Sequence, residues 1–335
     1  MFLISRLFGL LIFCSIIAIG WLWSDYQNFL QNPMSLPENG MTLNINSGDS
    51  LKHLVKKLEK KKIISKISYF KWYARINNLD RKIQAGEYNL FSGLTPIAFF
   101  ESIVSGKVIS YSITFPEGWN FKQIMNLIGK NPMIRNDLKN LSNKEIMNML
   151  GYSGIKPEGR FFPDTYFFPR KTRDIDILKR AYKKMQTQLD LAWANRNKKN
   201  VLLKNKNEAL ILASIIEKET SLASERDIIS GVFSRRLSLN MKLQTDPTVI
   251  YGMGDKYKGN IRRKDLREDT PFNTYVHKGL TPTPICMPGR AALDAAVNPR
   301  EGKELFFVSK GDGSHFFSET LEQHNKAVKK YQLKK

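Results

Sequence analysis

The sequence predicts an α+β protein with an N-terminal transmembrane helix, a small β-α-α-β module and a larger α+β domain. Residues 7–23 form an uncharged and almost wholly apolar run. Residues 41–105 show strand-like alternation, then helical spacing of apolar residues, then a strand pattern again. Because the chain has 335 residues and 42% apolar content, it can bury a substantial core, and its length favours two domains.

The N-terminal run has the length and the flanks of a membrane anchor. A bilayer core needs about 20 apolar residues, with roughly 17 as the lower limit. Arg6 stands before the run, and Trp21 and Trp23 stand near its other end, as in an aromatic belt. These flanks predict a cytoplasmic tail at 1–6 and a transmembrane anchor at 7–24, with the rest of the chain outside.

A cleaved signal peptide is the alternative to an anchor, because Ala18 and Gly20 are small residues of the kind found near cleavage sites. The tryptophans that follow at once favour the anchor. The chain has two cysteines, Cys14 in the apolar run and Cys286 far downstream. A thiol within a membrane does not readily meet one in a soluble domain, so no disulfide is expected.

The net charge of +22, from 53 Lys and Arg against 31 Asp and Glu, favours polyanionic partners such as nucleic acid, anionic lipid or an acidic wall polymer. A compositional bias towards lysine without any function explains the even spread of charge equally well. No aromatic residues interleave with the lysine clusters as a stacking platform requires, and zinc-finger spacing is absent from the sequence. We therefore expect no nucleic-acid partner.

Residues 25–40 are predicted to form a linker, since positions 31–40 contain two prolines and a glycine. The small module follows over 41–105. Alternation over 41–45 predicts a strand, and the apolar stripe of 51–58 predicts an amphipathic helix. The other elements expected in the module are a helix over 67–76, a turn and strand over 84–90, and a helix over 95–104 that ends at Gly106.

The rest of the chain divides into a connecting segment and a larger domain. The predicted parts are a connecting segment over 106–155, with a strand over 108–115 and short helices within 121–150, and a catalytic domain over 156–335. A long helix over 174–195 has apolar residues at helical spacing from Ile177 to Leu189, a pattern typical of core packing. The motifs that carry chemistry follow between residues 207 and 325.

Residues 208–220 have the pattern of an apolar helix, and this helix contains two glutamates for which we expect different environments. If each residue advances the helix by 100° and Leu210 is placed at 0°, the apolar side chains centre at about 170°. Glu219 then falls at about 180° and Glu217 at about 340°. Glu217 is expected to be solvated or in a salt bridge. Glu219 is expected to point inwards or into a cleft at the helix end, where low dielectric raises the pKa of a carboxyl group. A carboxylic acid that stays protonated near neutral pH suits general acid catalysis at a glycosidic oxygen.

The alternative for Glu219 is a terminal carboxylate that turns out to water, and periodicity alone favours that alternative. The motifs 243–251 and 270–275 shift the balance, because both are dense in hydrogen-bonding and aromatic side chains, as sugar sites are. Each motif alone is also consistent with ordinary turn chemistry. The candidate substrate-binding residues are Gln244, Asp246, Tyr251, Asn273 and Tyr275.

Metal chemistry is not expected. His277, His315 and His324 lack the spacing of metal ligands, so neither a metal nor another cofactor is predicted. Asp246 is the nearby candidate for a second carboxylate, and no pattern in the sequence requires it as a nucleophile.

Several short motifs stand in a fixed order along nearly the whole chain. They are Ala-Gly-Glu-Tyr at 85–88, Gly-Arg-Phe-Phe-Pro-Asp-Thr-Tyr at 159–166, Ala-Ser-Ile-Ile-Glu-Lys-Glu-Thr at 213–220, Gln-Thr-Asp-Pro-Thr-Val-Ile-Tyr-Gly-Met-Gly at 244–254, Phe-Asn-Thr-Tyr at 272–275 and Gly-Ser-His-Phe-Phe-Ser at 313–318. Together they closely resemble the endolytic murein transglycosylases, the YceG-like family.

This resemblance implies a location, an activity and a catalytic residue. Members of the family sit in the bacterial inner (cytoplasmic) membrane with the catalytic part outside, and the module at 41–105 is similar to their LysM-like glycan-binding domain. They cut the β-1,4 bond between N-acetylmuramic acid and N-acetylglucosamine in nascent peptidoglycan strands, leave 1,6-anhydro ends and have a role in ending strand elongation. By resemblance the catalytic glutamate is Glu219, which the helical spacing also selects, and peptidoglycan synthases are candidate partners.

Two positions depart from the family pattern. Thr281 stands where the family commonly has proline, and Met287 stands where it favours asparagine; by analogy both lie in a substrate-facing loop. Two alternatives to a lytic transglycosylase stay open on the sequence. One is a non-catalytic peptidoglycan-binding scaffold, and the other is a muramidase that hydrolyses the glycan with water.

Overall fold

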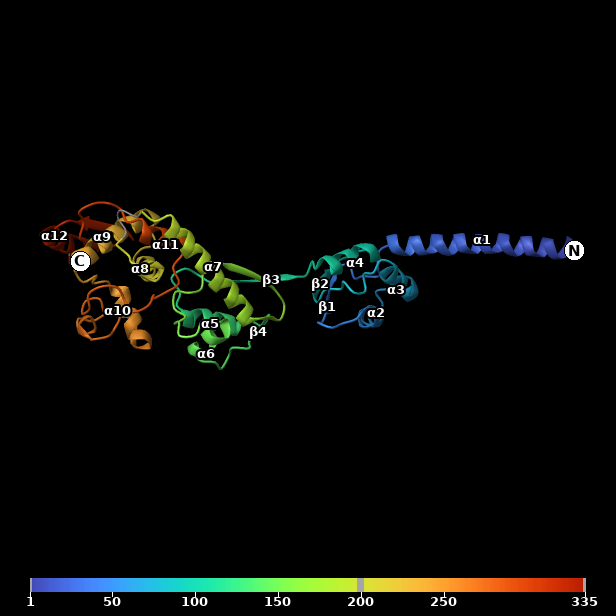
Figure 1. Ribbon diagram of the computed structural model, residues 1–335, viewed down its shortest axis with the longest axis horizontal. Helices are drawn as coiled ribbons and strands as arrows, with labels where there is room; N and C mark the ends of the chain where they lie inside the picture. Colours follow the sequence, from blue (N-terminus) through green and yellow to red (C-terminus); the bar gives the residue numbers. More distant parts are fainter. Residues whose placement is uncertain (1, 198–201, 334–335) are drawn as a thin grey trace. The chain divides into compact units, whose positions relative to one another are not determined.

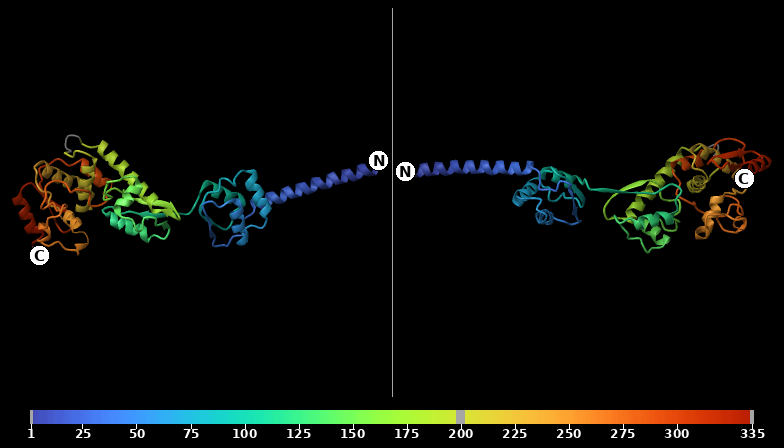
Figure 2. Two further views of the ribbon diagram at one scale, coloured as in Figure 1. Left: turned by 60° about the horizontal axis from the view of Figure 1, so that its bottom comes forward. Right: turned by 180° about the vertical axis from the view of Figure 1, so that it is seen from behind.

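The computed structural model describes residues 2–197 and 202–333. Residues 1, 198–201 and 334–335, which belong to the predicted tail and catalytic domain, lie outside this description. By its contacts the chain divides into two units: unit 1 is Met1–Tyr111 with Phe168–Arg170, and unit 2 is Ser112–Phe167 with Lys171–Lys335. Both units mix helix and strand, as Figure 1 and Figure 2 show, so the predicted α+β class is confirmed.

Unit 1 begins with the helix α1, Phe2–Gln31. Its stretch from Arg6 to Gln31 is long and apolar enough to cross a membrane. A helix of 30 residues is about 45 Å long, which exceeds the roughly 30 Å of a hydrocarbon layer. The large apolar side chains from Leu7 to Trp23 are exposed. The predicted apolar N-terminal helix is therefore confirmed, and it fits a single-pass membrane anchor.

The module of unit 1 has the predicted β-α-α-β order, followed by the predicted third helix. Its elements are β1 (Met41–Ile45), α2 (Leu51–Lys60), α3 (Ile67–Ile76), β2 (Gly86–Leu90) and α4 (Pro96–Ser105). Strands β1 and β2 are antiparallel, with Leu43 opposite Tyr88, and both side chains lie in the apolar core. Helix α4 ends at Gly106, whose φ of 69° is the left-handed conformation that favours glycine.

The last turns of α1 pack on the module. Tyr26 and Leu30 are buried, and α1 contacts both α3 and α4. The Lys66 ammonium lies 2.5 Å from a carboxylate oxygen of Asp25, so an ion pair ties α1 to the start of α3. Residues 25–31, assigned from the sequence to a linker, thus continue the helix, because the module covers their apolar side chains.

Glu87 on β2 holds the two chain segments that leave and re-enter unit 1. Its carboxylate accepts hydrogen bonds from the Tyr111 hydroxyl at 2.5 Å and the Arg170 guanidinium at 3.0 Å. Tyr111 belongs to β3 (Ser110–Thr114), and Arg170 directly follows β5 (Thr165–Pro169), the strand paired with β3. The Ala-Gly-Glu-Tyr motif therefore fixes these strands to the module.

Unit 2 is mainly helical. Its elements are α5 (Phe121–Lys130), β4 (Ile134–Arg135), α6 (Asn143–Leu150), β6 (Thr172–Arg173), α7 (Asp174–Ala194), α8 (Lys206–Glu219), α9 (Arg226–Ser238), α10 (Asp246–Met253), α11 (Arg290–Val297), β7 (Phe306–Ser309), β8 (His315–Ser318) and α12 (Leu321–Tyr331), with short 3-10 turns at Ala223–Glu225, Gly254–Lys256 and Asp265–Arg267. Strands β4 and β6 are parallel, and β7 and β8 are antiparallel.

Helix α8 lies at the centre of unit 2. All residues from Ala209 to Ile216 are buried, and α7, α9, α10 and α11 pack around them. The sequence predicted one apolar face, but this helix is covered on every side because other helices surround it. A helix of this kind is fixed in position along its whole length, which positions the residue at its end.

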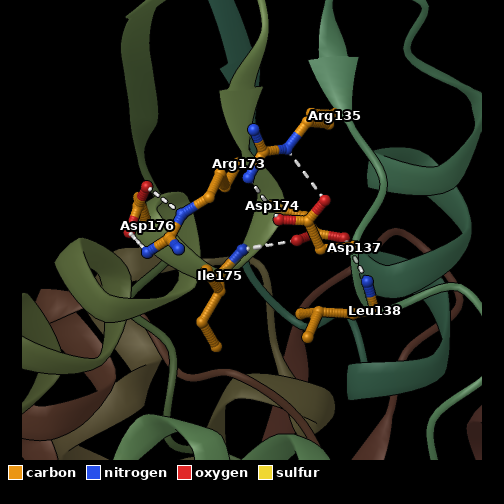
Figure 3. Close-up of polar contacts among 7 residues, drawn as sticks. All are labelled: Arg135, Asp137, Leu138, Arg173, Asp174, Ile175 and Asp176. Atoms are coloured by element: carbon orange, nitrogen blue, oxygen red, sulfur yellow. Dashed lines mark hydrogen bonds and ion pairs between the residues drawn. The ribbon is translucent and has the colours of Figure 1, made fainter.

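A buried aspartate fixes the start of the long helix α7 (Figure 3). Asp174 is 1% exposed, and its two carboxylate oxygens accept backbone N–H bonds from Leu138 at 2.9 Å and Ile175 at 2.7 Å. A negatively charged side chain at this position suits the N-terminus of a helix. Two surface ion pairs flank it, Arg135–Asp137 and Arg173–Asp176. The chain between β4 and α6 is thereby tied to α7.

Replacing Asp174 by alanine should lower the free energy of unfolding by about 1–3 kcal/mol, because two buried N–H groups lose their acceptor. Asp176→Ala is the matched control, since it removes an exposed ion pair and should cost at most about 1 kcal/mol. Denaturant unfolding of the detergent-solubilised protein measures both changes. A loss at Asp174 no larger than the loss at Asp176 would contradict this role.

Candidate active site

Glu219 is the last residue of α8, and the helix end is anchored from the side. The backbone turns to an extended conformation at Thr220. One turn earlier, the Ser214 hydroxyl accepts the backbone N–H of Ile285 at 3.0 Å, and the Cys286 thiol donates to the Ser214 carbonyl at 3.2 Å. These bonds hold the end of α8 against the segment that precedes α11.

The Glu219 carboxyl group is held by a threonine. The Thr245 hydroxyl donates a hydrogen bond to one carboxyl oxygen of Glu219. Burial raises the pKa of Glu219 to about 7, the bond from Thr245 opposes this shift, and the negative charge of Asp246 adds to it. The residue keeps partial access to the surface. Glu219 can therefore exchange a proton near neutral pH with a group that reaches it.

Glu217, two residues earlier, has a different environment. Its side chain is 6% exposed, it lies 3.5 Å from the Arg226 guanidinium, and it accepts the backbone N–H of Gly289 at 2.8 Å. Of the two expectations for this residue, the salt bridge is confirmed and solvation is wrong. Burial raises the pKa of Glu217, and the Gly289 N–H and Arg226 oppose this shift. Because both partners hold its carboxyl group, Glu217 serves the packing of α8 against α9 and the start of α11.

Three threonines bring the two predicted motifs together beside Glu219. The Thr248 and Thr274 hydroxyls share a hydrogen bond of 2.8 Å, and the Thr245 N–H donates to the Thr274 hydroxyl at 3.1 Å. Both bonds are buried. The first turn of α10 and the Phe-Asn-Thr-Tyr segment are thus joined at the end of α8.

Three predicted substrate-binding residues lie around this junction. The Tyr275 hydroxyl donates to Asp246 at 2.6 Å, and burial together with Asp246 raises the pKa of Tyr275. Gln244 is exposed, and its side-chain oxygen accepts a bond from the buried Arg236 at 3.2 Å. Arg236 has no marked signal in the sequence, yet it also binds the backbone carbonyl of Leu243 at 2.9 Å and so fixes the loop.

Asn273 differs from what the sequence predicted for it. The residue is 1% exposed, and its amide nitrogen donates to backbone carbonyls of the preceding loop, with the bond to Glu268 at 2.8 Å. Its side-chain oxygen accepts the N–H of Tyr275 at 2.9 Å. All of these partners are backbone groups, so this asparagine shapes the loop and does not face a substrate.

A cleft of about 960 Å³ is lined in part by residues of the same segments, among them Lys218, Pro247 and Phe272, while Glu219 and Asp246 are not among its lining residues. Tyr251 lines it, as a substrate-binding residue should, and its ring packs edge-on against Phe272 at 4.8 Å. The Tyr251 hydroxyl donates to Glu158 at 3.1 Å. Burial raises the pKa of Glu158 to about 7. No local pattern singles out Glu158, because its partner Tyr251 lies far away along the chain.

The two residues that depart from the family pattern, Thr281 and Met287, are both buried. Thr281 donates a hydrogen bond to the Thr283 carbonyl at 2.8 Å, and Met287 exchanges backbone bonds with Gly118 and Trp119. The side chains of both residues thus pack inside, whereas Thr283 and Ile285 of the same loop line the cleft, so a substrate-facing loop stays a prediction. Threonine in place of proline and methionine in place of asparagine therefore change the packing behind the site.

Two of the predicted histidines of unit 2 have partners within the chain. His315 pairs with the buried Glu225 at 2.7 Å, and His324 stacks on Phe306. In the part of the chain that the structure describes, no group of three or more His, Cys, Asp and Glu side chains is placed to hold a metal ion.

An apolar N-terminal helix, a carboxyl group with a pKa of about 7 and a cleft with aromatic and polar walls are features suited to an enzyme that cleaves glycosidic bonds by general acid catalysis. The chain belongs to the YceG-like family, whose model matches residues 43–330.

Three comparisons agree with this assignment. A protein of Bacillus subtilis named endolytic murein transglycosylase is 34% identical over 87% of this chain and 84% of its own length. A Streptococcus pneumoniae protein with the same name is 24% identical over 95% of this chain and 63% of its own length. A crystal structure of a YceG-like protein from Listeria monocytogenes has a TM-score of 0.55 and 29% identity, covering 87% of this chain and 99% of the other.

Glu219→Gln should stabilise the protein at alkaline pH. The folded-state pKa of Glu219 is about 7 and the ordinary value is 4.5, so stabilisation by the protonated carboxyl is full below about 4.5 and is lost as the pH rises through about 7. Glutamine does not ionise. Relative to the wild type, the variant should therefore gain on the order of 3 kcal/mol between about pH 5 and about pH 9.

Denaturant unfolding at both pH values measures this gain. Glu322→Gln, which changes an exposed carboxyl of α12, is the control and should show no comparable gain. A stability difference for Glu219→Gln that is the same at both pH values would show that the pKa of Glu219 is not raised.

Proposed function

We propose that this chain is an endolytic lytic transglycosylase that cuts the β-1,4 bond between N-acetylmuramic acid and N-acetylglucosamine in nascent peptidoglycan. Its relatives are named endolytic murein transglycosylases, and the family match covers most of the chain. The observation that carries the proposal is the Glu219 carboxyl, which has a pKa of about 7, is held by Thr245 and lies beside a cleft.

In the proposed mechanism, Glu219 acts first as acid and then as base. The protonated carboxyl donates its proton to the glycosidic oxygen as the bond from that oxygen to C1 of muramic acid breaks. The carboxylate then accepts the proton of the C6 hydroxyl of the same sugar, whose oxygen attacks C1. The product is a 1,6-anhydro ring, no water is consumed, and the attack is intramolecular and gains from proximity.

The neighbours of Glu219 suit this sequence of steps. Asp246 is held by Tyr275 at 2.6 Å and raises the pKa of Glu219 by its negative charge. The same charge favours the positive charge that develops at C1 in the transition state. Thr245 orients the carboxyl in both protonation states. A second carboxylate nucleophile is not required, since the substrate supplies its own.

We further propose a membrane arrangement. Helix α1 anchors the chain in the inner (cytoplasmic) membrane, with residues 1–6 inside and the chain after about residue 24 outside, because Arg6 precedes the apolar stretch and Trp21 and Trp23 stand near its other end. The module at 41–105 is a LysM-like domain that binds glycan, and the catalytic domain begins near residue 156. Termination of growing strands implies nearness to peptidoglycan synthases, which are candidate partners.

Glu219→Gln should lower kcat for release of anhydro ends from nascent strands by about 10²–10⁴-fold, because the acid and base are lost together. Glu217→Gln is the matched control, since it keeps an acceptor for the Gly289 N–H and should retain activity while losing stability. Mass spectrometry of the products measures both. An active Glu219→Gln protein beside an inactive Glu217→Gln protein would refute the assignment.

The same product analysis distinguishes the alternatives. Reducing muramic ends in place of anhydro ends would identify a hydrolytic muramidase. Binding of strands without any cleavage would identify a scaffold, a role that does not require a carboxyl group with a raised pKa at the end of a buried helix.

The proposed orientation predicts labelling from outside. In spheroplasts, Lys139→Cys should react with a membrane-impermeant maleimide without permeabilisation, because Lys139 is an exposed residue of unit 2. The parent chain is the control, since Cys286 is buried and Cys14 lies in the apolar helix. Labelling that requires permeabilisation would reverse the orientation.

A further inference from the structure

The cleft beside Glu219 carries a group of lysines that the proposed mechanism does not use. The lysines that line it are Lys122, Lys144, Lys156 and Lys218. Lys122 pairs with Asp255 at 2.8 Å. Among the described residues, no carboxylate lies within ion-pair distance of the other three. Lys218 also donates a hydrogen bond to the Gly118 carbonyl at 3.5 Å. The exposed ammonium groups of Lys144 and Lys156 are therefore the ones available to a ligand.

The acidic groups of the cleft leave this positive charge largely uncompensated. Asp255 is already paired with Lys122. Glu158 is buried at the wall, where it accepts the Phe121 N–H at 3.0 Å and the Tyr251 hydroxyl at 3.1 Å. Because burial raises the pKa of Glu158 to about 7, this group carries less than a full negative charge near neutral pH. The cleft thus favours an anionic ligand.

The walls of the cleft are mixed in character. Apolar surface comes from Ile250, Tyr251 and Phe272, and amide side chains come from Asn120 and Gln123. A ligand that suits these walls has carboxylates for the lysines, methyl or aliphatic groups for the apolar surface, and amide groups for the polar side chains. A short acidic peptide has all three.

We propose that this cleft binds the acidic stem peptide that the muramic acid residues of the substrate carry. Lys218 and Pro247, which line the cleft, directly adjoin Glu219 and Asp246 in the chain, so the end of α8 and the start of α10 each contribute to its wall. The stem peptide is attached through the lactyl group of muramic acid, the same sugar whose C1 reacts. This site rests on the proposed function, because it takes its ligand from the glycan that Glu219 cleaves.

A second anion belongs to a nascent strand, namely the pyrophosphate that links it to lipid. A pyrophosphate is compact and favours closely convergent cations and backbone N–H groups. The lysines here are distributed around a large cleft with apolar walls, which suits an extended peptide better. The experiment includes an arm that separates these two ligands.

The test measures binding by the full-length Glu219→Gln protein, which holds strands without cutting them. The ligands are glycan strands with intact stem peptides and the same strands after an amidase has removed the peptides, each with and without the lipid pyrophosphate end. The variant combines Lys144→Gln and Lys156→Gln. The matched control combines Lys130→Gln and Lys139→Gln, exposed lysines of unit 2 that do not line the cleft.

We expect the reference protein and the control to bind peptide-bearing strands about 3- to 10-fold more tightly than stripped strands. The Lys144 and Lys156 variant should lose most of this preference and bind stripped strands unchanged. Added salt should weaken the preference, because exposed charges are screened.

Four other outcomes would each contradict the proposed peptide site. They are equal binding of both strand types by the reference protein, a preference that survives in the lysine variant, an equal loss on both strand types, and a dependence on pyrophosphate alone. Cleavage by the chain with Glu219 intact is assayed separately. If the protein shows the expected binding preference but releases no anhydro ends, the proposed function is refuted while the peptide site is still supported.

Discussion

The burial of helix α8 on every side is the constraint on which the site of this protein depends. Four helices pack around the stretch from Ala209 to Ile216, and Ser214 ties it to the segment before α11. A helix fixed in this way leaves its last residue little freedom. Glu219 therefore stands at one defined place, where Thr245 reaches its carboxyl group. The position of this carboxyl group therefore follows from the packing of the helix that ends with it.

Three glutamates of unit 2 show how environment divides roles among identical side chains. Glu217 has Arg226 and a backbone N–H for its charge, and it serves structure. Burial and the like charge of Asp246 raise the pKa of Glu219 to about 7, against the hydrogen bond from Thr245, so its proton is retained to near neutral pH. Glu158 is buried beside Tyr251 and supports the wall of the cleft. Burial acts on all three, and the available partners decide which of them can exchange a proton.

Unit 1 couples the anchor to the small module through direct contacts. Helix α1 continues beyond its apolar part, and Tyr26 and Leu30 are covered by the module while Asp25 pairs with Lys66. A flexible linker at this point would separate the module from the membrane. The continuous helix instead holds the module close to the end of the membrane-spanning stretch. Such a position suits an enzyme whose substrate is a strand still being made at the membrane.

The sequence by itself determined the features that depend on local pattern. The apolar length of α1, the β-α-α-β order of the module and the bounds of α3, Ile67–Ile76, follow from periodicity and turn residues. The prediction that Glu219 and not Glu217 is the reacting residue also came from spacing along one helix, although the structure buries Glu217 as well. The tertiary structure alone decided the burial of α8 on all sides, the inward turn of Asn273 and the place of Glu158. Glu158 and its partner Tyr251 are 93 positions apart, and no local pattern records a contact made over such a distance.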